Sequence, residues 1–495
     1  MGILPGLSAA ERAHAAWLAG HRPDLAARYT TALPGARATV LAKLWGAMVR
    51  EELPGRTAAA PDRVTINGHE VRGSAAAAQP FAAVAPQFSL SGNVMPHAVA
   101  ATLWPERPAF AAELDESVAN LALARAADPH RPVDPDSLVA AEQSVADGHP
   151  LHPCCRTRTG MDTADQLAYA PEHRPVVRLA VVEVPAGRWH GTLPPILPVH
   201  PWQWHRLREE FPWLRDTGRR LPARPLMSLR TFATADGHVK TSVDVRMTSA
   251  VRGVSAAAVH NGPVLSARLE RLLRGTPIAV LAEPGAGSVL VDGAPYRGLA
   301  VVRRHAPTLG PDERALPFAA LTAGRPSAAE LVHAGYGGDP HAFLGHLAGL
   351  ALPTLLRLLE RGIGLEAHGQ NLLLVVAHHR AARLLYRDLG GVRVHGPDAA
   401  GLTGDIPTDD PDAPAVKLLA SFVSTVLAEL VTHLARRFGT DPDGLWRTVL
   451  AAVPRDTPRR DVLLRPTLPL KALTAMRLHD TVEDIWTPLP NPMAR

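Results

Sequence analysis

A short polar stretch between apolar segments, Glu366-Ala-His-Gly-Gln-Asn371, places the strongest constraint on this chain. It follows an apolar run with helical spacing over 343–359 and precedes Leu372–Val376, whose composition predicts a buried strand. A second apolar run then ends just before Asp388. Acids, an imidazole and amides at the ends of buried elements need partners, which a metal ion, a phosphate or another ligand supplies. The alternative is a polar loop that caps a helix.

Length and composition indicate a globular protein with more than one lobe. At 495 residues the chain is longer than one hydrophobic core usually supports. Hydrophobic residues make up 46% and charged residues 20% of the chain. The net charge of +5 is spread without a run of like charges, which argues against a nucleic-acid-binding protein. We expect a helical lobe over 1–130, a β-rich lobe over 131–335 and a mainly helical lobe over 336–495.

The sequence predicts a cytoplasmic protein without a membrane span. No basic region followed by an apolar segment opens the chain, so we expect no signal peptide. The longest apolar stretch contains His346, Pro353 and Arg357, which is typical of a core helix. Cys154 and Cys155 are adjacent and cannot form a disulfide framework, which fits a reducing compartment.

Lysine is scarce in this chain, with four lysines against 48 arginines. An ammonium differs from a guanidinium in shape and in donor geometry, so the two are not freely exchangeable at a site. The retained lysines are therefore candidates for positions that arginine cannot fill. They are Lys43, Lys240, Lys417 and Lys471.

Residues 148–160 combine prolines and terminal glycines with two histidines and two arginines, which predicts a rigid loop without repetitive structure. Arg156 and Arg158 alternate, so a strand there would point both side chains to one face, as an anion-binding clamp requires. His149 and His152 are spaced for metal binding, but no third histidine or carboxylate follows at ligand spacing. A zinc site is therefore disfavoured.

The segment 226–252 predicts a β-hairpin with its turn at Asp236-Gly237. In the second strand Lys240 and Thr248 fall on one face, together with other polar residues. A solvated strand face has the same pattern, so the pattern alone does not identify a site.

Loop length decides which residues of the first strand join Lys240. A three-residue loop pairs Thr234 with His238 and brings Ser228 and Arg230 onto the face of Lys240. A two-residue loop sends them to the opposite face. We expect the three-residue loop.

Five segments, taken together and in order, resemble the IucA/IucC family of NRPS-independent siderophore synthetases, of the aerobactin-synthetase type. The segments are GHPLHPCCRTRTG (148–160), HPWQWH (200–205), SLRT with KTSVDVRMTSAVR (228–252), EAHGQN with Asp388, and KALTAMRL (471–478). The resemblance covers about residues 120 to 480. The chain departs from the family at Arg156, where lysine is usual, at Met161, where an aromatic residue is frequent, and at Gly369, where glutamine is more common.

The resemblance implies an α+β fold with three lobes arranged like a cupped hand (thumb, fingers and palm). The resemblance also implies a mixed or antiparallel sheet region, a mainly helical C-terminal lobe and an ATP-binding site in the cleft between the lobes. The implied reaction is attack of a carboxylic acid, commonly citrate, on the α-phosphate of ATP, which gives an acyl adenylate and pyrophosphate. An amine, hydroxylamine or alcohol then displaces AMP. Mg²⁺, a homodimer and a place in siderophore biosynthesis for iron acquisition are also implied.

Position by position, the resemblance implies ATP contacts from His152, Arg158, Ser228, Arg230, Lys240, Gln370, Asn371 and Asp388. It implies Glu366 and Asp388 as Mg²⁺ ligands, and Thr248, Arg252, His368 and Lys471 as contacts of the carboxylic substrate. His368, Arg252 and Lys240 are the implied catalytic residues. Fixed cations stabilise the negative charge that develops at the α-phosphate, and a planar guanidinium suits a carboxylate.

Two alternatives stay open from the residues. A kinase-like phosphotransferase is suggested by Asn371 and an Asp seventeen residues later, although no Asp occupies a catalytic-base position in the EAHGQN segment. A non-enzymatic ferric-siderophore-handling protein would need several cysteine thiolates for an iron–sulfur cluster, and this chain has two adjacent ones. The reaction products distinguish the synthetase from the phosphotransferase, because adenylation gives AMP and pyrophosphate whereas phosphotransfer gives ADP.

Overall fold

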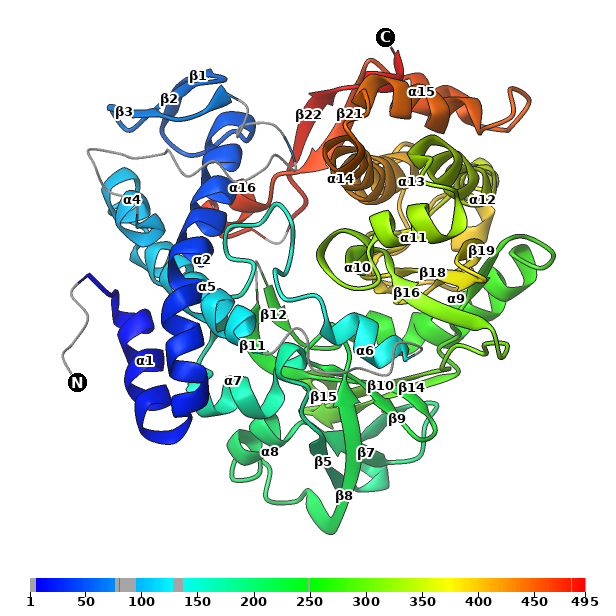
Figure 1. Ribbon diagram of the computed structural model, residues 1–495. Helices are drawn as coiled ribbons and strands as arrows, with labels where there is room; N and C mark the ends of the chain where they lie inside the picture. The colour runs from blue at the N-terminus through cyan, green and yellow to red at the C-terminus, as the bar shows by residue number, and fades with distance from the viewer. Residues whose placement is uncertain are drawn as a thin grey trace.

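The computed structural model describes residues 6–75, 80, 95–127, 137–247, 250–481 and 483–494, with the backbone alone at 246, 247 and 250–252. Figure 1 shows three groups of elements: N-terminal helices on the left, a large sheet at the bottom, and C-terminal helices on the upper right. Thr248 lies outside the described residues, and Arg252 is described by its backbone in strand β12 (Ala250–Arg252).

The N-terminal group is helical and has its own apolar core. Its elements are α1 (Ala9–His21), α2 (Pro23–Arg50), α4 (Pro96–Leu103), α5 (Pro108–Ala126) and the small sheet β1 (Arg56–Ala60), β2 (Arg63–Ile66) and β3 (His69–Arg72). Tyr29, Trp45 and Phe110 fill the core together with Ala475 and Leu478, which come from the far end of the chain. Burial of these apolar side chains is the main term that holds the helices together.

Two buried carboxylates tie the C-terminal helix α16 (Leu473–Leu478) to this core. Glu51 accepts a hydrogen bond from the backbone nitrogen of Ala475 at 2.7 Å. Glu113 accepts two from the guanidinium of Arg477, each at 2.6 Å. Burial raises the pKa of Glu51 to about 7, against opposing effects of the Ala475 hydrogen bond and of Arg50.

This raised pKa gives a prediction for Glu51→Gln. The folded-state pKa lies above the ordinary value of 4.5, so the stability that protonation of Glu51 contributes is complete below that value and is lost as the pH rises through about 7. We expect the wild type to lose on the order of 1–3 kcal/mol of unfolding free energy relative to the variant between about pH 5 and pH 8. Urea unfolding across this range measures it, and parallel pH slopes for the two proteins would contradict it.

The middle of the chain forms an eight-stranded antiparallel sheet in the order β6-β14-β15-β10-β9-β8-β5-β7. The strands are β5 (Val177–Glu183), β6 (Trp189–Gly191), β7 (Ile196–Val199), β8 (Arg215–Pro225), β9 (Thr231–Thr234), β10 (Gly237–Thr241), β14 (Gly285–Val291) and β15 (Ala294–Arg304). Helix α9 (Ala256–Leu272) lies against β14 and β15. The predicted hairpin is β9–β10, near the centre of this sheet.

The prediction of a three-residue loop in this hairpin is wrong. Thr234 pairs with Gly237, and Lys240 pairs with Thr231, so the loop has two residues. Gly237 is already part of the sheet, with φ of 111°. A Cβ there would lie 2.9 Å from the carbonyl oxygen of Arg304 on the next strand, so glycine is needed for close pairing with β15 and not for a longer loop.

The predicted second strand is also interrupted. It ends at Thr241, and β11 (Val243–Met247) continues in a different sheet with β12 (Ala250–Arg252) and β4 (Arg158–Thr159). At the break, Ser242 donates a hydrogen bond to the carbonyl oxygen of Arg297 at 2.6 Å. Polar side chains that bond to the backbone in this way compete with the strand ladder.

The C-terminal group combines a four-stranded sheet with apolar helices. The strands, in spatial order, are β13 (Ile278–Val280), β19 (Arg380–Tyr386), β18 (Leu372–Ala377) and β16 (Glu313–Pro317). The helices are α10 (Phe318–Ala323), α11 (Ala328–Gly335), α12 (Pro340–Glu360), α13 (Ala413–Leu418), a π-helical segment (Leu419–Leu427), α14 (Ala428–Phe438) and α15 (Pro442–Ala451). The predicted strand after the polar stretch is β18, and the second apolar run, which ends before Asp388, lies in β19.

Two helical segments here are long and apolar enough to cross a membrane, but both belong to the core. In Pro340–Glu360 and Ala413–Phe438, 61% and 67% of the most apolar window is buried inside the protein. Phe343 and Phe422 are 0% exposed. The prediction of a buried helix over 343–359 is confirmed.

Helices and mainly antiparallel sheets form separate groups, with β13–β19 as a parallel pair, which confirms the α+β class. The division at residues 130 and 335 stays a prediction. Elements of one predicted lobe pack in another. Helix α16, from the last part of the chain, packs in the N-terminal core, and β13 and β16, which precede residue 335, join the C-terminal sheet. The last strands, β21 (Thr467–Lys471) and β22 (Trp486–Pro490), pair antiparallel in a separate sheet, and α16 lies in the connection between them.

Candidate active site

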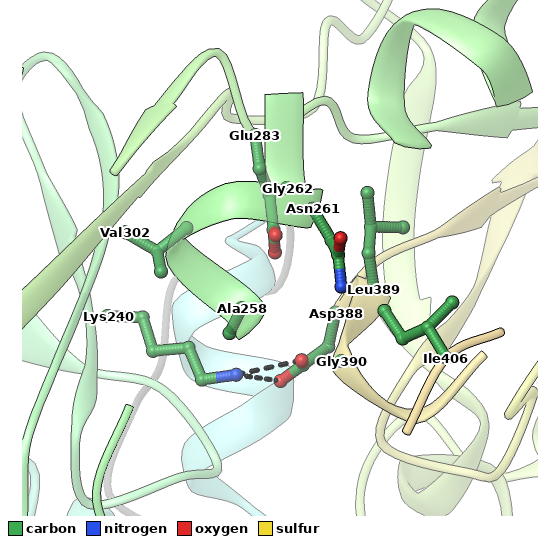
Figure 2. Close-up of a pocket in the computed structure, with 10 residues that line it drawn as sticks. All are labelled: Lys240, Ala258, Asn261, Gly262, Glu283, Val302, Asp388, Leu389, Gly390 and Ile406. Atoms are coloured by element: carbon green, nitrogen blue, oxygen red, sulfur yellow. Dashed lines mark hydrogen bonds and ion pairs between the residues drawn. The ribbon is translucent and has the colours of Figure 1, made fainter. Parts of the chain in front are cut away.

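Lys240 and Asp388, which are far apart in sequence, form an ion pair between the central sheet and the C-terminal group. Both carboxylate oxygens of Asp388 lie 2.8 Å from Lys240 Nζ, and Figure 2 shows the two side chains meeting at one edge of a pocket. Lys240 projects from β10, whereas Asp388 follows β19 with φ of 67°, which non-glycine residues rarely adopt. Arg304 from β15 lies 3.7 Å from the same carboxylate and 2.8 Å from Glu283.

These contacts fix the charge of Asp388. Burial acts to raise the pKa of Asp388, but Lys240 and Arg304 outweigh it and hold this pKa well below its usual range. Burial lowers the pKa of Lys240, and Asp388 offsets only part of that effect. Asp388 is therefore an anion at neutral pH, neutralised by cations of the protein itself. It keeps 29% of its side-chain surface exposed, so a ligand can reach it.

Asp388 lines two pockets. Figure 2 shows the first, which α9 closes with Ala258, Asn261 and Gly262, and which Lys240 also lines. The second pocket is lined by residues from five separate segments of the chain: Glu142, Ser228, Arg304, Gln370, Asn371 and Asp388. It thus brings together four residues that the sequence predicts as ATP contacts. A concave site with converging polar groups is the usual setting for a small-molecule substrate.

Ser228 reaches the second pocket although the hairpin register differs from the prediction. Ser228 and Arg230 lie in a turn before β9 begins at Thr231, so the alternation of strand faces does not set their direction. Arg230 donates a hydrogen bond to the carbonyl oxygen of Gly253. Its charge is close enough to lower the pKa values of Lys240 and Asp388, after the larger effects of burial and of their mutual pairing.

Glu366 and His368 lie beside a second group of charges. Lys417 bridges two acids, at 3.4 Å from Glu366 and 3.0 Å from Asp484. Lys471 lies 2.6 Å from Asp484. His368 Nε2 is 4.0 Å from Glu366. Together with Lys240 on Asp388, three of the four lysines therefore contact carboxylates at this site.

The charges of Glu366 and His368 follow from their surroundings. Burial acts to raise the pKa of Glu366, but Lys417 and His368 lower it below its ordinary value. Burial also lowers the pKa of His368, although Glu366 opposes this. His368 is thus neutral near pH 7, where it donates or accepts hydrogen bonds without carrying charge.

The fourth lysine, Lys43 of α2, donates to the carbonyl oxygens of Asp147 and His149 at 3.2 and 2.9 Å. It fixes the loop that carries His149 and His152. Burial lowers the pKa of His149, with smaller contributions from His152, Lys43, His368 and Lys471. The loop thus lies within electrostatic range of His368. Among the described residues no group of three or more His, Cys, Asp or Glu could hold a metal ion.

Arg156 and Arg158 converge on one anion, but the protein supplies that anion. Arg158 is 4% exposed and donates to Glu172 at 2.8 Å and to Gln166 at 2.7 Å. Arg156 lies 3.5 Å from Glu172 and belongs to a turn, since only Arg158–Thr159 forms a strand. Nδ1 of the buried His152 accepts from the backbone nitrogen of Cys154. ATP contacts from His152 and Arg158 stay predictions.

Some charged residues of the site were not singled out from the sequence. Arg304 and Glu283 complete the surroundings of Asp388, and Asp484 joins Lys417 to Lys471. Arg387 precedes Asp388 and forms a buried pair with Glu142. Lys417 differs from these residues, because the scarcity of lysine already makes it a candidate in the sequence. The others look like ordinary surface charges in the sequence.

Comparisons with known proteins find two matching families and several similar proteins. Residues 137–193 and 194–323 match the IucA / IucC family, and residues 341–485 match the ferric iron reductase FhuF-like transporter family. Staphyloferrin A synthase of Staphylococcus aureus is 27% identical over 429 residues, which are 73% of each chain.

Two solved structures have the same fold over nearly their full length. The petrobactin biosynthesis protein AsbB from Bacillus anthracis gives a TM-score of 0.77 at 20% identity, over 95% of this chain and 98% of that one. The ATP-bound aerobactin synthetase IucA from Klebsiella pneumoniae gives 0.72 at 19% identity, over 92% and 99%. The predicted fold is confirmed.

Proposed function

Because this chain belongs to the IucA/IucC family of NRPS-independent siderophore synthetases, we propose that the pockets around Asp388 bind ATP and adenylate a carboxylic acid. The chain is an ATP-dependent ligase that joins a carboxylic acid to an amine in siderophore biosynthesis. The observation that carries the site assignment is the Lys240–Asp388 pair, with Arg304, Ser228, Gln370 and Asn371 next to it.

In the proposed reaction a carboxylate oxygen of the acid attacks the α-phosphorus of ATP, and the bond to the bridging oxygen of pyrophosphate breaks. We assign stabilisation of the added negative charge to Lys240, Arg304 and Arg230, whose charges gather around Asp388. The amine then attacks the acyl carbon, and AMP leaves with the electron pair of the acyl–oxygen bond. We assign Arg252, Thr248, His368 and Lys471 to the acid, with citrate or a related polycarboxylate as the substrate class.

Glu366 and Asp388 are the proposed Mg²⁺ ligands. Their donor set fits this ion, because Mg²⁺ usually binds through one or two carboxylates and substrate phosphates and keeps several waters. The two carboxylates are close enough for the charge of Asp388 to act on the pKa of Glu366, after the larger effects of burial and of its cationic neighbours. When bound, the ion would neutralise phosphate charge.

The test is pyrophosphate release with Mg-ATP across citrate, succinate, 2-oxoglutarate and acyl-hydroxamate acids, with hydroxylamine as a surrogate nucleophile. Acid-dependent formation of AMP and pyrophosphate supports adenylation. ADP in the same samples would support the phosphotransferase instead. The match to the FhuF-like family does not favour iron–sulfur chemistry, because Cys154 and Cys155 lie outside the matched residues. A homodimer and a cytoplasmic location stay predictions.

Arg252→Ala is predicted to weaken use of the acid far more than binding of ATP. A guanidinium that holds a carboxylate through two hydrogen bonds contributes roughly 1.5–3 kcal/mol, so kcat/KM for the acid should fall by roughly 10- to 100-fold. The Kd of ATP should stay within about threefold, because the ATP contacts proposed above come from other segments. Acid titrations of pyrophosphate release and calorimetry with ATP measure the two. Equal losses would remove Arg252 from the acid pocket.

A further inference from the structure

A fully buried ion pair forms part of the wall of the second pocket. Arg387 Nη1 is 2.6 Å from Glu142 Oε1, and their side chains are 3% and 0% exposed. Glu142 belongs to α6 (Leu138–Gln143), whereas Arg387 precedes Asp388 after β19. The pair joins segments that are 245 residues apart in the chain.

Each member of the pair also holds a backbone segment that carries proposed ATP contacts. Glu142 Oε2 accepts a hydrogen bond from the backbone nitrogen of Met227 at 2.8 Å, one residue before Ser228. The Arg387 guanidinium donates twice to the carbonyl oxygen of Gln370, at 3.1 and 2.9 Å. The backbone nitrogen of Arg387 donates to the carbonyl oxygen of Asn371 at 3.0 Å.

We propose that Glu142 and Arg387 are positioning residues for the nucleotide, an inference that rests on the proposed function. The pair fixes the spacing between Ser228 on one side and Gln370, Asn371 and Asp388 on the other. Reacting groups must be held closely, because a displacement of about 1 Å costs on the order of 100-fold in rate. Charged hydrogen bonds in a buried setting hold such a spacing better than apolar packing.

The test separates position from stability with three variants. Glu142→Gln keeps the size of the side chain and removes its charge. The double variant Glu142→Leu/Arg387→Met removes both charges, which often restores stability, but it cannot bond to Met227 or Gln370. Glu11→Gln is the matched control, because buried Glu11 likewise accepts from a backbone nitrogen (Ser8, 2.9 Å) and from one arginine (Arg37), in the N-terminal core.

We expect Glu142→Gln and the double variant to raise KM for ATP by at least about tenfold, with KM for the acid within about threefold. Hydrogen exchange at Met227 and across 366–371 should be faster in both. Glu11→Gln should lower the unfolding midpoint and leave both KM values unchanged. If KM for ATP in the double variant returns to the wild-type value together with stability, the pair is only structural and the proposal fails.

Failure of the proposed function gives a different result. A wild-type protein that releases no pyrophosphate with any acid would overturn the adenylation reaction. In that case calorimetry with ATP alone and hydrogen exchange still test the pair. Wild-type ATP affinity and wild-type exchange in Glu142→Gln would overturn the positioning role, and a loss of both would support it.

Discussion

Lys240→Ala is expected to reduce pyrophosphate release by about 100- to 1,000-fold with every acid, which is the usual effect of removing one group that stabilises transition-state charge. The variant loses the ammonium that contacts both oxygens of Asp388 at 2.8 Å. It also leaves the carboxylate with Arg304 at 3.7 Å, so more negative charge faces the incoming phosphates. Initial rates at saturating acid and Mg-ATP measure the loss.

Lys240→Arg is the matched control for this prediction. The side chain keeps its charge, but a planar guanidinium replaces a compact ammonium. Elsewhere in the chain nearly all basic positions are arginine. We expect Lys240→Arg to have less than about a tenth of the wild-type rate, because the planar guanidinium cannot occupy the buried position between β10 and Asp388. Wild-type rates in Lys240→Ala would remove Lys240 from the phosphate site.

The local elements around the site could be predicted because each has its own pattern. Leu372–Val376 and Ala382–Tyr386 are runs of strand length, and both lie in strands, the first buried throughout and the second buried over Leu384–Tyr386. Their ends carry Gln370, Asn371 and Asp388, as the sequence indicates. What the pattern does not contain is the partner of Asp388, since Lys240 lies 148 residues away on another sheet. Only the resemblance to a family placed these residues in one site.

Hairpin register could not be predicted because contacts beyond the hairpin decide it. Gly237 looks like a turn residue, yet it is glycine because the carbonyl oxygen of Arg304 on β15 approaches it closely. The strand break at Ser242 likewise depends on Arg297, which is distant in sequence. Glu142, Glu283 and Asp484 are single acids without a local motif. Their roles follow from tertiary pairs, which no short window of sequence specifies.

Arg158→Ala is predicted to destabilise the fold by about 3–5 kcal/mol, the usual result of removing one partner of a buried ion pair. Arg158 and Glu172 have side chains that are 5% and 2% exposed. Burial acts to raise the pKa of Glu172, and Arg156 and Arg158 together hold it well below its usual range. Without Arg158 the carboxylate loses its two hydrogen bonds at 2.8 and 3.0 Å and keeps only the longer contact with Arg156 at 3.5 Å. Urea unfolding near neutral pH measures the loss.

Arg158→Met/Glu172→Met separates the structural role of Arg158 from its predicted contact with ATP. Removing both charges of the pair often recovers stability, and Arg156, which then lacks its carboxylate, keeps its hydrogen bonds to the carbonyl oxygens of Val145 and Ala146, so this variant should be more stable than Arg158→Ala. If Arg158 also binds ATP, the Kd of ATP stays raised in the restored protein. If the affinity returns with the stability, Arg158 acts only through Glu172. A stable Arg158→Ala variant would contradict the predicted loss, because the buried carboxylate would then have found another cation.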